Sequence, residues 1–243
     1  MIRRTLTAAL AVIGLAAAAP LSAAAARPGP VMPPTLDGPV SKAAAAGTCT
    51  LSLPWRVAVG RPMLTLYGKR TGTCAVSGNT SGWVLNHPSQ GEVNGILWHP
   101  TDPFGNGRWE VPAEHPIGSM VWKGVGSINA DGSEHTQNNL PVTVKLAAGA
   151  WISSARTGDV VTLKGTSLLY SVSTNSYFKR SAAGVFQFRE RGSSTWQTLK
   201  GGVWTNSKGE VTMAYRYSKV RDYRFSLYST PISWDLGSAV TTR

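Results

Sequence analysis

The residues best suited to acid–base or metal chemistry are the four histidines, which all lie between residues 87 and 135. Three of them, His87, His99 and His115, directly precede a proline. Gathered at one end of a domain with nearby carboxylates, they could bind a metal ion or transfer a proton. The alternative is that they mark strand ends, because a residue before proline is held extended and their spacing follows no regular ligand pattern. The nearby carboxylates are Asp102, Glu110, Glu114 and Glu134.

Motifs of known catalytic or nucleotide-binding sites are absent from the sequence. It contains no His-Glu-x-x-His, no Gly-x-Ser-x-Gly and no phosphate-binding loop, and its Gly-x-Gly segments at 105–107 and 124–126 are typical of turns. With only 12 Asp and Glu residues, a pair of catalytic carboxylates is also disfavoured. We therefore predict no catalytic residues, no cofactor and no bound metal.

Positive charge is the strongest chemical signal. The chain has 24 Lys and Arg against 12 Asp and Glu, a net charge of +12. Residues 151–243 hold thirteen of the basic and five of the acidic side chains, a net charge of +8, whereas residues 27–150 carry only +2. This charge favours an acidic protein or an anionic polymer as partner. Nucleic acid is not expected, since no binding motif for it is present.

Arginines alternate with aromatic residues in this basic part. Arg216 lies between two tyrosines, and Arg224 lies between Tyr223 and Phe225. In a strand, such alternation places the aromatic side chains on one face and the arginines on the other. The alternative is an ordinary solvated face. We predict a single partner-binding surface formed by Arg189, Arg191, Arg216 and Arg224.

Nine tryptophans exceed what two small cores require. Trp98 shares a strand face with Ile96, which predicts a place in the core. Trp109 and Trp204 neighbour glycine-rich turns, where exposed aromatic residues would suit a protein interface or stacking on a sugar. For each of these two, packing in the core is the favoured alternative.

The first 26 residues have the features of a secretory signal peptide. Arg3 and Arg4 precede an apolar run from Leu6 to Ala19 that is too short to span a bilayer, and small residues follow up to Ala26. No other segment is long and apolar enough to cross a membrane. We expect a secreted, extracellular protein that does not span the membrane, with a net charge of +10 after cleavage.

Both cysteines, Cys49 and Cys74, lie in the part expected to be exported. In an oxidising compartment an even pair usually forms a disulfide, and closing a loop of this length stabilises by roughly 3 kcal/mol. Zinc binding is the weaker alternative, because no further Cys or nearby His completes a ligand set. We predict a structural disulfide.

Residues 27–47 are rich in proline and alanine and lack a periodic apolar pattern. The segment is either a spacer or a docking peptide that becomes ordered on a partner, since proline reduces the backbone entropy lost on binding. If it docks, we expect the contacts to come from Val31, Met32, Pro33, Pro34 and Leu36.

From residue 48 onward the pattern is that of β-strands. Apolar and polar residues alternate at 50–53, 63–67 and 82–85, and turn signals stand at 77–79, 105–107 and 131–132. No segment shows helical spacing of apolar residues over ten or more positions. We predict an all-β protein with two tandem sandwiches, one at 48–148 with the disulfide and a basic one at 149–243.

Residues 151–243 resemble the immunoglobulin-like domains of secreted actinobacterial proteins. The resemblance rests on a second-strand pattern at 158–165, on segments 185–189 and 195–199 around a turn at 192–194, and on segments 215–217 and 222–225. It implies an immunoglobulin-like β-sandwich. Tyr223, two residues before the inward position of Phe225, then has the place of a tyrosine corner.

The order of signal peptide, proline-rich tail and two sandwiches is similar to that of adaptor subunits in secreted, umbrella-type toxin particles of actinobacteria. There a small β-protein links a lectin to a large toxin. This resemblance implies a non-enzymatic adaptor that bridges other secreted proteins through its tail and sandwich surfaces, in an antibacterial toxin complex. One alternative is a cell-envelope protein that binds anionic wall polymer or glycan through the basic domain. The other is an enzyme with a histidine–carboxylate site in the first domain.

Overall fold

The computed structural model describes residues 47–102 and 106–243, and within them the chain consists of strands and turns. The first group of strands is β1 (Thr48–Ser52), β2 (Arg56–Val59), β3 (Met63–Tyr67), β4 (Lys69–Gly72), β5 (Thr80–His87), β6 (Gly91–Trp98), β7 (Arg108–Pro112), β8 (Gly118–Ile128), β9 (Thr136–Gln137) and β10 (Leu140–Leu146). The second group is β11 (Ala148–Thr157), β12 (Val160–Ser171), β13 (Ser176–Lys179), β14 (Ala183–Glu190), β15 (Gln197–Trp204), β16 (Glu210–Arg216), β17 (Arg221–Leu227), β18 (Leu236–Gly237) and β19 (Thr241–Thr242). This part of the chain holds no helix of the length and hydropathy that crossing a bilayer requires.

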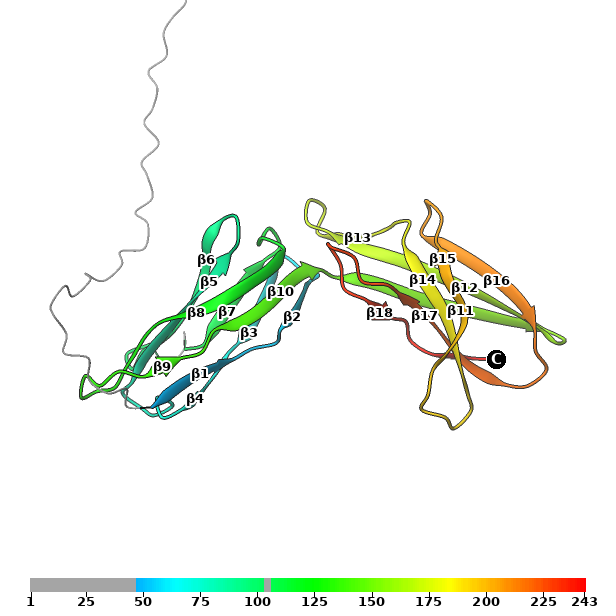
Figure 1. Cartoon of the computed structure of the whole chain (residues 1–243). Coiled ribbons are helices and arrows are strands. Elements are labelled where there is room, and N and C mark those ends of the chain that lie inside the picture. The colour runs from blue at the N-terminus through cyan, green and yellow to red at the C-terminus, as the bar shows by residue number, and fades with distance from the viewer. Residues whose placement is uncertain (1–46, 103–105) are drawn as a thin grey trace, which may run out of the picture. The chain divides into compact units, whose positions relative to one another are not determined.

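The first group folds as a β-sandwich (Figure 1). Its larger sheet has the strand order β2-β10-β8-β5-β6, and the smaller sheets β4-β1-β9 and β3-β7 supply the other side of the core. Alternation along the strands turns every second side chain inward, so Trp83 and Leu85 of β5 are buried together. Trp109 of β7 and Trp122 of β8 meet edge to face, with ring centroids 5.1 Å apart. Aromatic packing thus joins the layers of this sandwich.

Cys49 of β1 is bonded to Cys74, which follows β4, with a Cα–Cα distance of 5.2 Å. Strands β1 and β4 are antiparallel neighbours, and Cys49 stands opposite Gly72 in their register. The bridge therefore closes the end of two paired strands instead of joining two sheets. The predicted disulfide is confirmed.

The second group forms an immunoglobulin-like β-sandwich of two antiparallel sheets, which confirms the predicted all-β class with sandwich domains. One sheet has the order β11-β12-β13 with β16 also on β12, and the other has the order β15-β14-β17-β18 with β19 also on β17. The core between them contains Val161 and Leu163 from the first sheet and Phe186 and Phe225 from the second. Strand β10 ends at Leu146, and β11 begins two residues later in the other sandwich.

Phe225 occupies the centre of this core because two glycines leave room for its ring. A Cβ on Gly165 of β12 would stand 2.7 Å from Cγ of Phe225, and a Cβ on Gly184 of β14 would stand 2.8 Å from the same ring. One glycine comes from each sheet. The inward orientation predicted for Phe225 is thus present, and it depends on close approach of the backbone on both sides.

Tyr223 is fully buried, but its partner differs from the one that a tyrosine corner implies. Its hydroxyl hydrogen-bonds to the hydroxyl of Tyr215 on β16, at 2.5 Å, whereas a tyrosine corner bonds to backbone. The reason is that β16 lies in the facing sheet and brings a second inward tyrosine within reach.

The segment between β17 and β18 contacts strands β2 and β10. The indole Nε1 of Trp234 donates to the carbonyl of Val57 at 2.9 Å, and Asp235 pairs with Arg56. Lys145 of β10 donates to the carbonyl of Thr230. These contacts fix the position of Asp235, which lines the pocket described below.

A candidate binding face on the C-terminal sandwich

Alternation along β14 and β17 produces a face that carries several charged side chains. Tyr223 and Phe225 point into the core, so the intervening Arg224 points outward. The register of the two strands sets Gln187 opposite Arg224 and Arg189 opposite Asp222. We call the outward side chains Gln187, Arg189, Asp222 and Arg224, together with the neighbouring Arg191 and Trp196, the arginine face.

Trp196 is the centre of the arginine face. The guanidinium carbon of Arg224 lies 4.3 Å from the centroid of its ring, and that of Arg189 lies 4.8 Å away. Cation–π contacts of this kind hold arginine side chains in fixed orientations. The two charges are therefore ordered before any partner arrives.

Asp222 is the carboxylate that neutralises part of this charge. It accepts hydrogen bonds from the hydroxyl of Thr242 at 2.7 Å and from Nε of Arg189 at 3.1 Å, and Arg191 lies 3.9 Å away. The Thr242 hydrogen bond, reinforced by the two arginines, holds the pKa of the Asp222 carboxyl below its ordinary value. Asp222 is thus ionised, and its carboxylate holds the side chains of Thr242 and Arg189 in position.

Arg224 carries charge that has no carboxylate of its own among the described residues. Its Nε donates to Oε1 of Gln187 at 2.8 Å. Burial, and then repulsion from Arg189, lower the pKa of the Arg224 guanidinium below its ordinary value. An added anion would relieve that repulsion, so this is where the arginine face favours a negative group.

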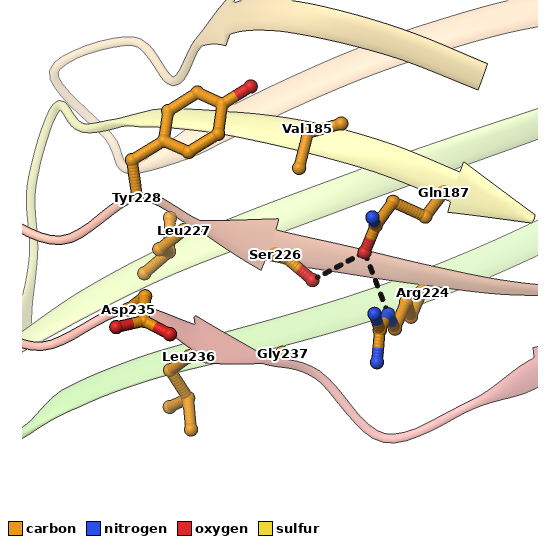
Figure 2. A pocket seen from close by; sticks show the side chains of 9 residues that line it. All are labelled: Val185, Gln187, Arg224, Ser226, Leu227, Tyr228, Asp235, Leu236 and Gly237. Carbon is orange, nitrogen blue, oxygen red and sulfur yellow. Dashed lines mark hydrogen bonds between the residues drawn. The ribbon is translucent and has the colours of Figure 1, made fainter. Parts of the chain in front are cut away.

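A shallow pocket of about 320 Å³ opens beside Arg224. Figure 2 shows Arg224 and Asp235 at its two ends, with the hydrogen bonds that Gln187 accepts from Arg224 and Ser226 between them. The pocket is lined by Val185, Gln187, Arg224, Ser226, Leu227, Tyr228, Asp235, Leu236 and Gly237.

The predicted surface of four arginines is only partly assembled. Arg189, Arg191 and Arg224 lie together at β14 and β17, but Arg216 lies on β16, opposite Val160 of β12, in the facing sheet. The prediction is therefore corrected for Arg216. Alternation correctly exposes its side chain, yet the exposed face belongs to the other side of the sandwich. The predicted tail contacts at Val31, Met32, Pro33, Pro34 and Leu36 lie outside the described residues.

Trp196 and Gln187 are functional candidates that the sequence reasoning missed. Trp196 precedes β15, and its stacking with arginines of β14 and β17 follows from the pairing of β15 with β14. The sequence feature that could have revealed Trp196 is its position just after the turn that follows β14, the strand that carries Arg189.

The four histidines lie in or after different strands of the described part of the first sandwich. No group of three or more His, Cys, Asp or Glu side chains in residues 47–102 and 106–243 is arranged to hold a metal ion. His87 ends β5 and His99 follows β6, as the strand-end alternative expects. His115 is buried, with Nδ1 2.9 Å from the carbonyl of Pro116. His135 is buried and hydrogen-bonds to Asn129 and Thr73.

The tryptophans divide between core and surface. Trp98 is buried as predicted, and Trp109, despite its neighbouring turn, is completely buried. Trp204, at the end of the edge strand β15, is 68% exposed. Of the two tryptophans noted beside glycine-rich turns, only Trp204 is therefore available to a partner.

No protein-family model matches the chain, and no curated protein matches it in sequence. Solved structures that match include an alpha-2-macroglobulin of E. coli, with 9% identity over 81% of this chain and a TM-score of 0.38. The FN1–FN3 domains of chicken CNTN1 match with 10% identity over 82% of this chain and 68% of that one, with a TM-score of 0.32. The D0–D1 domain of intimin matches with 13% identity over 80% and 96%, with a TM-score of 0.24. The chain spans only 14% of the length of the macroglobulin.

Proposed function

We propose that this protein is a secreted, non-enzymatic binding protein that bridges other secreted proteins. The observation that carries the proposal is the arginine face. Two arginines lie over the ring of Trp196 and a third lies near Asp222, and among the described residues only Asp222 offers these three a carboxylate. Such an ordered excess of positive charge suits an acidic protein surface, because complementary charge speeds association and rejects wrong partners.

The tail at residues 27–47 provides the second contact in this proposal. Its prolines reduce the entropy lost when an extended peptide binds in a cleft. Export by the signal peptide would bring the protein to its partners outside the cell. From the similarity of its overall plan to adaptor subunits of actinobacterial toxin particles, we propose that the assembly is an antibacterial toxin complex.

Affinity capture from native culture supernatant tests the bridging function. Three baits are compared: the protein without its signal peptide, the same protein lacking residues 27–47, and the double variant Arg189→Glu/Arg224→Glu. We expect one secreted partner to be lost with the tail and a different, acidic partner to be lost with the double variant. Loss of separate partners through separate parts of one chain is what bridging requires.

The matched control for the double variant is Arg216→Glu, which reverses an exposed arginine on the facing sheet. It should retain every partner. If the tail-deleted protein binds all partners of the intact protein, bridging through the tail is wrong. Equal loss in Arg216→Glu and in the double variant would show that net charge, and not the arginine face, determines binding.

A second candidate function is binding of an anionic wall polymer or glycan. Trp196 beside the arginines and the exposed Tyr228 of the neighbouring pocket favour it, because sugars stack on aromatic rings. The candidate predicts sedimentation with purified cell walls at low salt and release at about 0.5 M salt, where the screening length is only a few ångströms. Retention at high salt would contradict it.

A further inference from the structure

The pocket beside Arg224 carries opposite charges at its two ends (Figure 2). Arg224 stands at one end, and Asp235 stands at the other. One carboxylate oxygen of Asp235 is paired with Arg56, while the side chain as a whole remains 57% exposed. The cation at the Arg224 end therefore has no carboxylate of its own among the described residues, whereas the carboxylate at the Asp235 end is already paired.

The Arg224 guanidinium is prepared to receive a carboxylate. Its Nε is held by Oε1 of Gln187 at 2.8 Å, and the same oxygen accepts from the Ser226 hydroxyl at 3.1 Å. The stack on Trp196 fixes the plane of the group. Among the described residues neither Nη nitrogen has a hydrogen-bonding partner. A carboxylate can take two parallel hydrogen bonds from an arginine presented in this way.

Apolar side chains line the pocket together with the polar Gln187 and Ser226. Val185 and Leu227 are 7% and 5% exposed, and Leu236 and Tyr228 are both exposed at the rim. Apolar atoms of a ligand that cover Leu236 and Tyr228 would be removed from water, which is favourable in proportion to the area buried. The pocket thus combines one anion site with room for an adjoining apolar group.

This distribution of charge favours a protein segment over a uniformly charged polymer. A polyanion that places one charge on Arg224 finds no second unpaired cation in this pocket, because the carboxylate at the other end, Asp235, is already paired with Arg56. An acidic side chain flanked by apolar residues satisfies Arg224 and covers the apolar rim with a single charge. The ligand that fits carries one carboxylate next to apolar groups.

We propose that this pocket receives a single Asp or Glu side chain of an acidic protein partner, with its carboxylate on Arg224 and a neighbouring apolar residue on the exposed Leu236 and Tyr228. The inference rests on the proposed binding function and adds the contact that selects the partner. It assigns the pocket to protein recognition and assigns Arg224 the role of the central contact.

Titration of the ¹⁵N-labelled protein by NMR tests the pocket directly. The probes are the blocked tripeptide acetyl-Leu-Glu-Leu-amide, its neutral counterpart acetyl-Leu-Gln-Leu-amide and galacturonic acid. We expect the glutamate peptide alone to shift the Nε–Hε signal of Arg224 and the amides of 226–228 and 236–237 in a saturable way. The dissociation constant should rise about tenfold or more in Arg224→Gln.

Two further variants keep the test decisive. Arg216→Gln removes the same charge on the facing sheet and should leave the dissociation constant unchanged. Leu236→Trp fills the rim of the pocket at a 40% exposed position without a change of charge, and it should abolish binding. Equal weakening in Arg224→Gln and Arg216→Gln would overturn the proposal, and so would saturable binding of galacturonic acid in place of the peptide.

The capture experiment separates this inference from the function on which it rests. If an acidic partner is lost with Arg189→Glu/Arg224→Glu while the glutamate peptide leaves the pocket signals unchanged, the pocket assignment is wrong and the binding function stands. If the peptide binds in the pocket but no partner is captured, the pocket assignment is supported and the bridging function is wrong.

Discussion

The hydroxyl groups of Tyr215 and Tyr223 meet at 2.5 Å across the two sheets of the C-terminal sandwich. Tyr223 is fully buried, and burial, followed by this hydrogen bond, raises the pKa of its hydroxyl. This hydrogen bond gives the buried hydroxyl of Tyr223 a partner in the core. It also links β17, the strand that carries Arg224, to the facing sheet.

Replacing Tyr223 with phenylalanine should lower the free energy of unfolding by about 1 to 1.5 kcal/mol, because one hydrogen bond is lost and the Tyr215 hydroxyl is left without it. Urea denaturation of the single and double Phe variants measures the effect. The double variant should cost less than the sum of the two single ones. Tyr228→Phe, at an exposed position, is the control. Strict additivity would show that the two hydroxyls do not stabilise each other.

Any side chain at position 165 should lower the stability of the C-terminal sandwich. In Gly165→Ala the new Cβ would stand 2.7 Å from the Phe225 ring, and overpacking of this kind costs about 1–3 kcal/mol. Thermal denaturation should show a lower midpoint. Gly201→Ala, whose Cβ would find its nearest neighbours at 3.7 Å, is the matched control. If Phe225→Leu costs as much in the Gly165→Ala protein as in the wild type, the clash is not the cause.

Acid should destabilise the N-terminal sandwich through His115. Burial is the main cause that lowers the pKa of this imidazole, opposed by its hydrogen bond to Pro116 and assisted by the nearby His87. As the pH falls, the unfolded chain takes up the proton near its ordinary pKa of about 6.5, before the folded chain does. The stability that neutral His115 contributes is therefore fully present above about pH 6.5, the ordinary pKa of histidine. It is lost as the pH falls from there towards the lowered pKa that His115 has in the folded protein.

Urea denaturation at pH 7.5 and at pH 5 measures this dependence. The difference in unfolding free energy between the two conditions should shrink in His115→Gln and persist in His99→Gln, because His99 is only partly buried. An identical pH dependence in wild type and His115→Gln would assign the acid sensitivity to other groups.

The Cys49–Cys74 bridge should contribute roughly 3 kcal/mol, because it shortens the unfolded chain by closing a loop across 25 positions. The double variant Cys49→Ser/Cys74→Ser tests this by denaturation beside the oxidised wild type. Wild-type protein under reducing conditions should match the variant. If it remains as stable as the oxidised form, the paired strands β1 and β4 hold this end of the sandwich without the bridge.

The period-two pattern of the strands could be predicted from the sequence because it is local. Alternation alone set Phe225 and Tyr223 inward and Arg224 outward, and this is what the buried and exposed fractions show. The cysteine pair was also predictable, since an even pair with no other metal ligand nearby has one favoured outcome in an oxidising compartment, where the sequence leads us to expect this protein. These inferences need only the chemistry of neighbouring residues.

The tertiary structure alone decided which exposed residues act together. Arg216 and Arg224 have the same local pattern, but β16 pairs with β12 and β17 pairs with β14, so the two arginines lie on different sheets. Trp196 joined the arginine face, and Tyr215 became the partner of Tyr223, for the same reason. Which strand pairs with which depends on contacts between distant parts of the chain, and a local pattern does not contain that information.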